Sequence, residues 1–159
     1  MKKENILILC TGTAARSQMA EAYFKKFIGE RVNILSAGLE PQEVHPLAKA
    51  VMKEDGINID DQRSKGVEQF LGKLAFRHVI IVCEKAEKNC PRIFPGAMNR
   101  LFWPFEDPRV YKGSDNEKLE KFREIRDQIK ARIQEFVQGQ IYYHKAGNAC
   151  LLYRYSEIG

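Results

Sequence analysis

A cysteine and an arginine with five residues between them form the most reactive pattern in the chain. Cys10 and Arg16 are separated by a short loop that follows an apolar run, and Ser17 opens an amphipathic stretch. Such a strand-loop-helix turn can fold around a tetrahedral anion, because backbone N–H groups point inward and the helix adds its positive end. The same field lowers the pKa of a thiol, and the thiolate is the nucleophile. The pattern therefore predicts an oxyanion-handling enzyme with Cys10 as its nucleophile.

The rest of the loop supports this interpretation. Gly12 allows close backbone approach to an anion, and the guanidinium of Arg16 can grip two anion oxygens. Ser17 can cap the helix, donate to the Cys10 sulfur, or do both. The alternative is a structural cysteine buried at a strand end. The predicted oxyanion-binding residues are Thr11, Gly12, Thr13, Ala14, Ala15 and Arg16.

Two further features could take part in the chemistry. Cys83 and Cys90 have six residues between them, which is wider than the spacing of zinc-binding cysteine pairs, so no metal site is predicted. Asp107 precedes a proline and could move a proton to or from a reacting group. Asp-Pro is also ordinary turn chemistry, and local sequence leaves both readings open.

Alternating apolar runs and amphipathic stretches define the fold class. Strands are expected at residues 6–9, 32–37, 79–82 and 101–103, and helices at 17–28, 46–54 and 119–136. This order predicts a single three-layer α/β domain, with a four-stranded parallel sheet and helices on both faces. We expect the domain to span residues 1–139, with residues 140–159 as an extension that forms an extra strand or contacts another chain. No function is assigned to Cys150 in that extension.

Three of the expected strands end next to the reactive residues. Cys10, Cys83 and the segment after Trp103 all follow a strand. Because ligands of open parallel sheets bind outside the carboxyl ends of the strands, these three places should meet at one edge.

Composition excludes several other classes. The chain of 159 residues has a net charge of +5, but its basic and acidic residues are interleaved from Lys112 to Arg132, which disfavours nucleic-acid binding. No apolar run reaches the length of a membrane span or a signal peptide, so we expect a cytoplasmic protein.

Several motifs, taken in order, carry a resemblance over roughly residues 4 to 138. The chain resembles the low-molecular-weight tyrosine phosphatase superfamily, and more closely its thioredoxin-coupled arsenate reductase branch. The motifs are residues 10–21, 36–38, 62–65, 94–96 and 103–108.

The resemblance implies a specific use for three cysteines. Cys10 attacks arsenate, Cys83 attacks Cys10 as arsenite leaves, and Cys90 attacks Cys83. Thioredoxin then reduces the Cys83–Cys90 disulfide, and no tightly bound cofactor is needed. Reduction of arsenic(V) to arsenic(III) takes two electrons, as does one disulfide. Residues 84–89 are expected to be mobile so that the two sulfurs can meet, and Asp107 is expected to ease deprotonation of Cys83.

The chain departs from the family pattern in the loop and after Asp107. Members usually carry Asn and Ser where this chain has Thr13 and Ala14, which puts loop preorganisation and the potassium site of some members in doubt. Arg109 and Val110 replace the tyrosine pair of the phosphatase branch, which disfavours a protein-tyrosine substrate.

Two alternatives to arsenate reduction stay open. One is a phosphomonoesterase that uses Cys10 and Asp107 and has no role for the other cysteines. The other is a non-catalytic oxyanion or redox sensor. For the reductase, phosphate and sulfate are expected to compete with arsenate.

Overall fold

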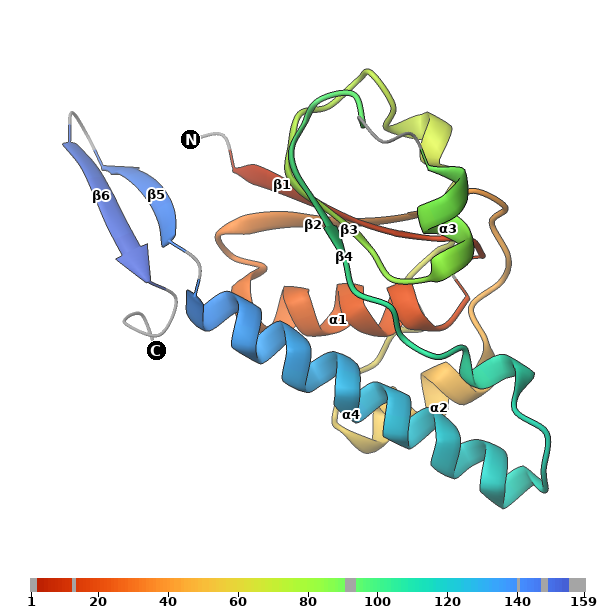
Figure 1. Ribbon diagram of the computed structural model, residues 1–159. Helices are drawn as coiled ribbons and strands as arrows, with labels where there is room; N and C mark the ends of the chain where they lie inside the picture. The colour runs from red at the N-terminus through yellow and green to blue at the C-terminus, as the bar shows by residue number, and fades with distance from the viewer. Residues whose placement is uncertain (1–2, 13, 91–93, 140, 147–148, 155–159) are drawn as a thin grey trace.

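A four-stranded parallel sheet forms the centre of the molecule (Figure 1). The computed structural model describes residues 3–12, 14–90, 94–139, 141–146 and 149–154. The sheet order is β2-β1-β3-β4, and the strands are β1 (Glu4–Cys10), β2 (Val32–Gly38), β3 (Phe76–Ile81) and β4 (Ala97–Phe102). The chain moves to one side of β1 to form β2 and then crosses to the other side to form β3. The crevice of such a sheet lies at this switch point, between the carboxyl ends of β1 and β3.

The two central strands are buried on both faces, as their continuous apolar sequences predict. Residues 6–9 of β1 pair with residues 78–81 of β3, and the apolar side chains of both runs have no exposed surface. Strands covered on both faces read as unbroken apolar runs because neither face meets water. Cys10 is the last residue of β1, and Cys83 lies two residues after β3.

Helices cover both faces of the sheet, as predicted (Figure 1). On one side lie α1 (Arg16–Ile28), α2 (Pro46–Glu54) and α4 (Asp115–Gly139), and on the other lies α3 (Glu84–Asn89). The helix α1 packs between the sheet and α4. Its Phe24 ring lies 6.1 Å from that of Trp103 and 6.0 Å from that of Phe136. Two short 3-10 turns, η1 (Val67–Gln69) and η2 (Pro108–Val110), complete the fold.

The structure adds one helix and corrects two expectations. Residues 84–89 form the helix α3, and their mobility stays a prediction. The strand β4 begins at Ala97 and ends before Trp103. The extension does not add a strand to the main sheet, because β5 (Ile141–Ala146) and β6 (Ala149–Arg154) pair with each other as an antiparallel hairpin. In Figure 1 this hairpin extends from the end of α4 on the left, whereas α3 and the start of α1 lie on the right.

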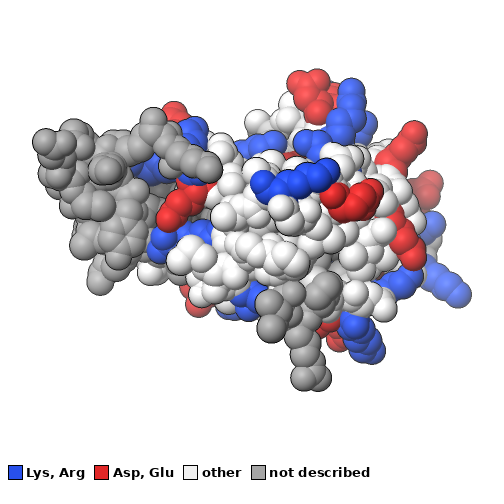
Figure 2. Space-filling model, turned by 90° about the horizontal axis from the view of Figure 1, so that it is seen from above, with Lys and Arg blue, Asp and Glu red and all other residues white. Residues whose placement is uncertain are grey.

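Charges are mixed on the face that Figure 2 shows. Lysine and arginine side chains alternate there with acidic ones and form no broad patch of one sign. Within the described ranges, no helix is both long enough and apolar enough to cross a membrane.

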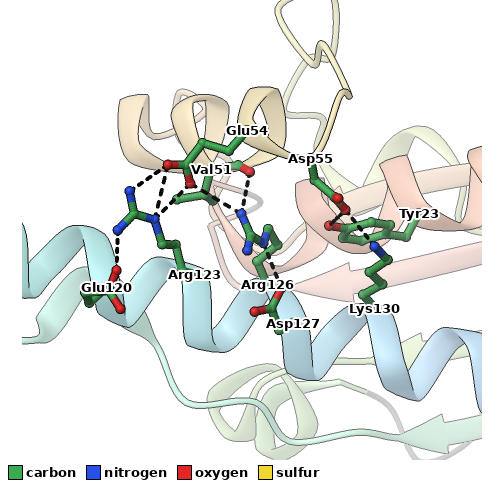
Figure 3. A network of polar contacts seen from close by, with 9 residues as sticks. All are labelled: Tyr23, Val51, Glu54, Asp55, Glu120, Arg123, Arg126, Asp127 and Lys130. Atoms are coloured by element: carbon green, nitrogen blue, oxygen red, sulfur yellow. Dashed lines mark hydrogen bonds and ion pairs between the residues drawn. The ribbon is translucent and has the colours of Figure 1, made fainter.

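A polar network joins α4 to the end of α2 (Figure 3). Arg123 donates to Glu54 at 2.9 Å, and Arg126 donates to the Val51 carbonyl at 2.9 Å. Beside them, Tyr23 Oη donates to Asp55 Oδ2 at 2.7 Å, and Lys130 Nζ lies 3.0 Å from the same oxygen. These contacts fix the long helix α4 against α2, and the contacts of Asp55 tie both helices to Tyr23 of α1.

Replacing Tyr23 by Phe is expected to lower the free energy of unfolding by about 1–2 kcal/mol at pH 7, because a hydrogen bond to a carboxylate is lost. The bond from Tyr23, and then that from Lys130, lowers the pKa of Asp55. A lowered folded-state pKa stabilises the fold above the unfolded pKa, and this stabilisation is lost as the pH falls through the folded value. Urea unfolding at pH 7 and at successively lower pH should therefore show the difference between variant and wild type shrinking at acid pH.

Candidate active site

Cys10 and Cys83 meet at the switch point of the sheet. Cys10 ends β1, and Cys83 caps the first turn of α3, where its sulfur accepts the amide of Ala86 at 3.4 Å. Both cysteines are free and buried, and their sulfurs are hydrogen-bonded to each other. Thr11 Oγ1 lies 3.3 Å from the Cys83 sulfur. The two thiols, which lie at the ends of neighbouring strands, therefore interact directly.

The two thiols shift each other's pKa in opposite directions. The hydrogen bond to Cys83, together with burial, raises the pKa of Cys10. The same hydrogen bond lowers the pKa of Cys83, helped by the Thr11 hydroxyl, the Ala86 amide and the charge of Arg16. In the ligand-free site these contacts favour the thiolate on Cys83, and the role of Cys10 as the activated nucleophile stays a prediction. The charge can still reach Cys10 by transfer of one proton along the hydrogen bond.

The loop from Cys10 to Arg16 is held from outside by its carbonyl groups. Segment 39–45, which follows β2, donates backbone hydrogen bonds to it. These are Leu39 N to Cys10 O at 3.2 Å, Glu40 N to Thr11 O at 2.8 Å, Gln42 N to Gly12 O at 2.7 Å and His45 N to Ala14 O at 2.8 Å. Carbonyls that turn outward leave the amide edge of the loop on the inner side, which is the arrangement of an anion nest.

The helix α1 begins at this loop without a side-chain cap. Its N-cap residue is Ala15, whose methyl side chain cannot accept a hydrogen bond from the first turn. The first amides of a helix have no partner inside the helix, and its dipole favours negative charge there. Ser17 lies inside the first turn, so the prediction that it is the N-cap is wrong. Its buried Oγ has no hydrogen-bond partner within the described residues.

Arg16 and Asp107 face each other across the cleft. The Arg16 guanidinium donates to the Phe105 carbonyl at 2.9 Å and lies 3.3 Å from Asp107 Oδ2. The backbone after β4 reaches this place because Trp103 N donates to Ile81 O at 2.8 Å. Asp107 also accepts a hydrogen bond from the amide of Arg109 at 3.0 Å and caps η2. Its carboxylate therefore lies at the cleft and also forms a turn, so both interpretations describe its position.

Asp107 is held in its ionised form. Burial acts to raise its pKa, but hydrogen bonds from Arg109 and the charge of Arg16 outweigh burial, and the net pKa of Asp107 is lowered. A carboxylate with a lowered pKa accepts protons poorly and gives none at neutral pH.

Sequence reasoning missed two residues of the site. Arg109 and Gln42 line a cleft of about 630 Å³ together with Thr11, Gly12, Arg16, Cys83 and Asp107. Arg109 was noted only as a replacement for a tyrosine. Its position two residues after Asp107, in a turn, is the one signal that could have marked it.

Cys90 lies at the far end of α3 from Cys83, as the C-cap residue. It is 7% exposed, and burial raises its pKa although Arg100 acts in the opposite direction.

Thr13 lies outside the described residues. The expectation about a potassium site depends on Thr13, so it also falls outside what the structure describes. In the described part of the chain, no three His, Cys, Asp or Glu side chains gather as they would around a metal ion.

Comparison with known proteins agrees with this arrangement. The profile of the low molecular weight phosphotyrosine protein phosphatase family matches residues 5–145. The chain belongs to this family. An arsenate reductase of Halalkalibacterium halodurans is 41% identical over 138 residues, which are 87% of this chain and 98% of the relative. The resemblance found in the sequence is confirmed, and within the family the chain is an enzyme of the arsenate reductase branch.

Two solved structures are similar to the chain. An arsenate reductase in its phosphate-binding state is 32% identical, with a TM-score of 0.66, and the match covers 84% of this chain and 95% of that one. A thioredoxin-dependent arsenate reductase of Corynebacterium glutamicum is 29% identical, with a TM-score of 0.59, and the match covers 87% of this chain and 64% of that one.

Proposed function

We propose that this protein reduces arsenate to arsenite, with Cys10 as nucleophile and Cys83 and Cys90 as the redox pair. The observation that carries the proposal is the hydrogen-bonded pair of Cys10 and Cys83 beside the oxyanion loop, with Cys90 at the other end of the same short helix. A phosphatase needs one thiol at this place. A two-electron reduction needs two, because one disulfide supplies two electrons.

The first step is the attack of Cys10 on arsenic. Arsenate enters the loop as a tetrahedral anion, bound by the amides of residues 11–16 and by Arg16. The proton of Cys10 passes to the arsenate hydroxyl oxygen that leaves, so the S–As bond forms as this oxygen departs as water and Cys83 keeps its thiolate.

Reduction follows when Cys83 attacks the Cys10 sulfur. The Cys10–Cys83 bond forms, the S–As bond breaks, and its electron pair leaves with arsenic as arsenite. Cys90 then attacks Cys83 and releases the Cys10 thiolate, leaving a Cys83–Cys90 disulfide. A dithiol protein such as thioredoxin reduces that disulfide, and the similarity to a thioredoxin-dependent reductase supports this partner. A cycle of free thiols suits the reducing cytoplasm.

The Cys83–Cys90 disulfide requires α3 to unwind. Seven residue steps along an α-helix span about 10 Å, whereas the Cα atoms of a disulfide are about 4.4–6.8 Å apart. The helix α3 has six residues and buries one side chain, Ala86. Its cap is the Cys83 sulfur itself, so the reaction that consumes this sulfur also removes the cap. The mobility expected of residues 84–89 is thus proposed for the oxidised state.

The state of Asp107 argues against the phosphomonoesterase. That reaction needs a protonated Asp107 as general acid for the leaving group. The contacts of Asp107 with Arg109 and Arg16 keep it ionised instead. An ionised Asp107 close to Arg16 suits a role as partner of the guanidinium.

Mass spectrometry after arsenate treatment tests the proposal. The reduced chain is treated with one equivalent of arsenate, alkylated and digested. We expect a Cys83–Cys90 disulfide and one equivalent of arsenite. A chain that hydrolyses p-nitrophenyl phosphate efficiently but forms no such disulfide would be a phosphatase, and a chain that binds arsenate without either product would be a sensor.

A further inference from the structure

The cleft contains a second guanidinium, besides that of Arg16. Arg109 follows Asp107 on η2, and its Nε lies 3.0 Å from Asp107 Oδ1 while its Nη2 lies 2.8 Å from Oδ2. On its other side, Nη1 donates to Gln42 Oε1 at 2.8 Å. These contacts hold a 24% exposed side chain in one place at the cleft wall.

This guanidinium lies directly over the oxyanion loop. A Cβ placed on Gly12 would be 3.3 Å from Arg109 Nη1 and 3.2 Å from Gln42 Oε1. Gly12 belongs to the loop that is expected to surround the anion, so Arg109 and Gln42 lie on the cleft side of the same site. A guanidinium has five N–H groups, and the contacts to Asp107 and Gln42 occupy three of them. The remaining donors of Nη1 and Nη2 are available to a ligand in the cleft.

Positive charge is scarce in this cleft. Its described lining includes four carboxylates but three cations, which are Arg16, Lys85 and Arg109. Lys85 lies at the mouth, where its Nζ is 3.7 Å from Glu40 and 64% of its side chain is exposed. Arg16 and Arg109 are therefore the described cations that can face a dianion inside the cleft and offset its carboxylates.

The direction of attack determines what Arg109 would contact. A nucleophile at the base of the loop must attack in line with the oxygen that leaves, so that oxygen points away from Cys10 and out of the loop. In a free tetrahedral oxyanion this outer oxygen is a strong acceptor. In a phosphate monoester the outer oxygen carries a carbon group. It is then a poor hydrogen-bond acceptor, and the carbon group lies against Arg109 and Gln42.

We propose that Arg109, positioned by Asp107 and Gln42 over Gly12, binds the outer oxygen of the substrate and selects a free tetrahedral dianion over a phosphate monoester. The inference rests on the proposed function for its substrate class and assigns the selection to a residue outside the loop. Arg109 is then a substrate-binding residue, and Gln42 is a positioning residue that acts through it.

Binding of inorganic phosphate to the reduced full-length chain tests the proposal by calorimetry. Arg109→Ala should weaken phosphate binding by about 10- to 50-fold, as expected for loss of a charge-assisted hydrogen bond. Lys85→Ala removes a cation from the mouth of the same cleft and should change the affinity by less than about threefold, because that charge is exposed. Arg109→Lys should lie between the wild type and Arg109→Ala.

Two further measurements separate contact from indirect effects. In the Asp107→Asn background, where no carboxylate is left unpaired, adding Arg109→Ala should still weaken phosphate binding by tenfold or more. For p-nitrophenyl phosphate, Arg109→Ala should change KM by less than about threefold. Unchanged phosphate affinity in Arg109→Ala, or equal losses for phosphate and ester, would overturn the proposal, and so would a wild-type chain that binds no phosphate.

The binding readout keeps this inference separate from the reductase. If the wild type binds phosphate through Arg109 but forms no arsenite, the proposed function fails and the assignment of Arg109 stands. If arsenite forms and Arg109→Ala retains its phosphate affinity, the assignment fails and the reductase stands. Circular dichroism of each variant checks that the chain is folded.

Discussion

Replacing Cys10 by Ser is expected to reduce arsenite formation by about ten-thousand-fold or more, because the chain loses its nucleophile. A serine hydroxyl does not ionise at neutral pH, and oxygen cannot enter the disulfide exchange that provides the electrons. Cys10 also ends β1 at the base of the oxyanion loop, and within the described residues no other thiol lies on that loop. The measurement is arsenite formed per chain in the presence of thioredoxin, thioredoxin reductase and NADPH.

Cys150→Ser provides the matched control, since it removes a cysteine from β6 of the hairpin, outside the main sheet. We expect it to keep the wild-type rate. Phosphate binding separates a chemical from a structural loss in Cys10→Ser, because the backbone of the loop and Arg16 remain. Arsenite formation by Cys10→Ser above one hundredth of the wild-type rate would contradict the assignment of the nucleophile.

The sheet and the place of the site could be predicted from sequence because both depend on local pattern. The apolar runs at residues 6–9 and 79–82 specify strands buried on both faces, and alternation with amphipathic stretches specifies parallel pairing. Parallel strands bring their carboxyl ends together. Cys10, Cys83 and Asp107 were therefore expected at one edge. In the structure Cys83 and Asp107 line one cleft, and Cys10 lies beside Cys83.

The remaining features depend on contacts between segments far apart in the chain. The helix α3 has six residues with one buried side chain, too few to show a helical period. Gln42 and Arg109 meet because segment 39–45 is hydrogen-bonded along the loop, which no local pattern encodes. The distribution of charge between Cys10 and Cys83 depends on donors from Thr11 and Ala86, which belong to two different strand ends.

Replacing Cys83 by Ser should stop the reaction before arsenite leaves, whereas replacing Cys90 by Ser should stop it after one equivalent. Without Cys83, no thiol hydrogen-bonded to Cys10 can attack its sulfur and break the S–As bond. Without Cys90, the Cys10–Cys83 disulfide forms and arsenite leaves once, but the second exchange does not follow. Multiple-turnover rates should fall by at least about a hundredfold in both variants, because each variant interrupts the series of thiol–disulfide exchanges.

Arsenite released in a single turnover distinguishes the two variants, and hydrogen exchange of α3 reports the accompanying motion. The amides of residues 84–89 should exchange faster once wild-type chain is oxidised by arsenate, because the Cys83–Cys90 bond is too short for an intact helix. In Cys90→Ser that bond cannot form, so α3 should lose only the cap that Cys83 provides to Ala86 and should remain partly protected. One equivalent of arsenite from Cys83→Ser would place the second thiol elsewhere. Full protection of α3 in the oxidised wild type would show that Cys90 does not receive the disulfide.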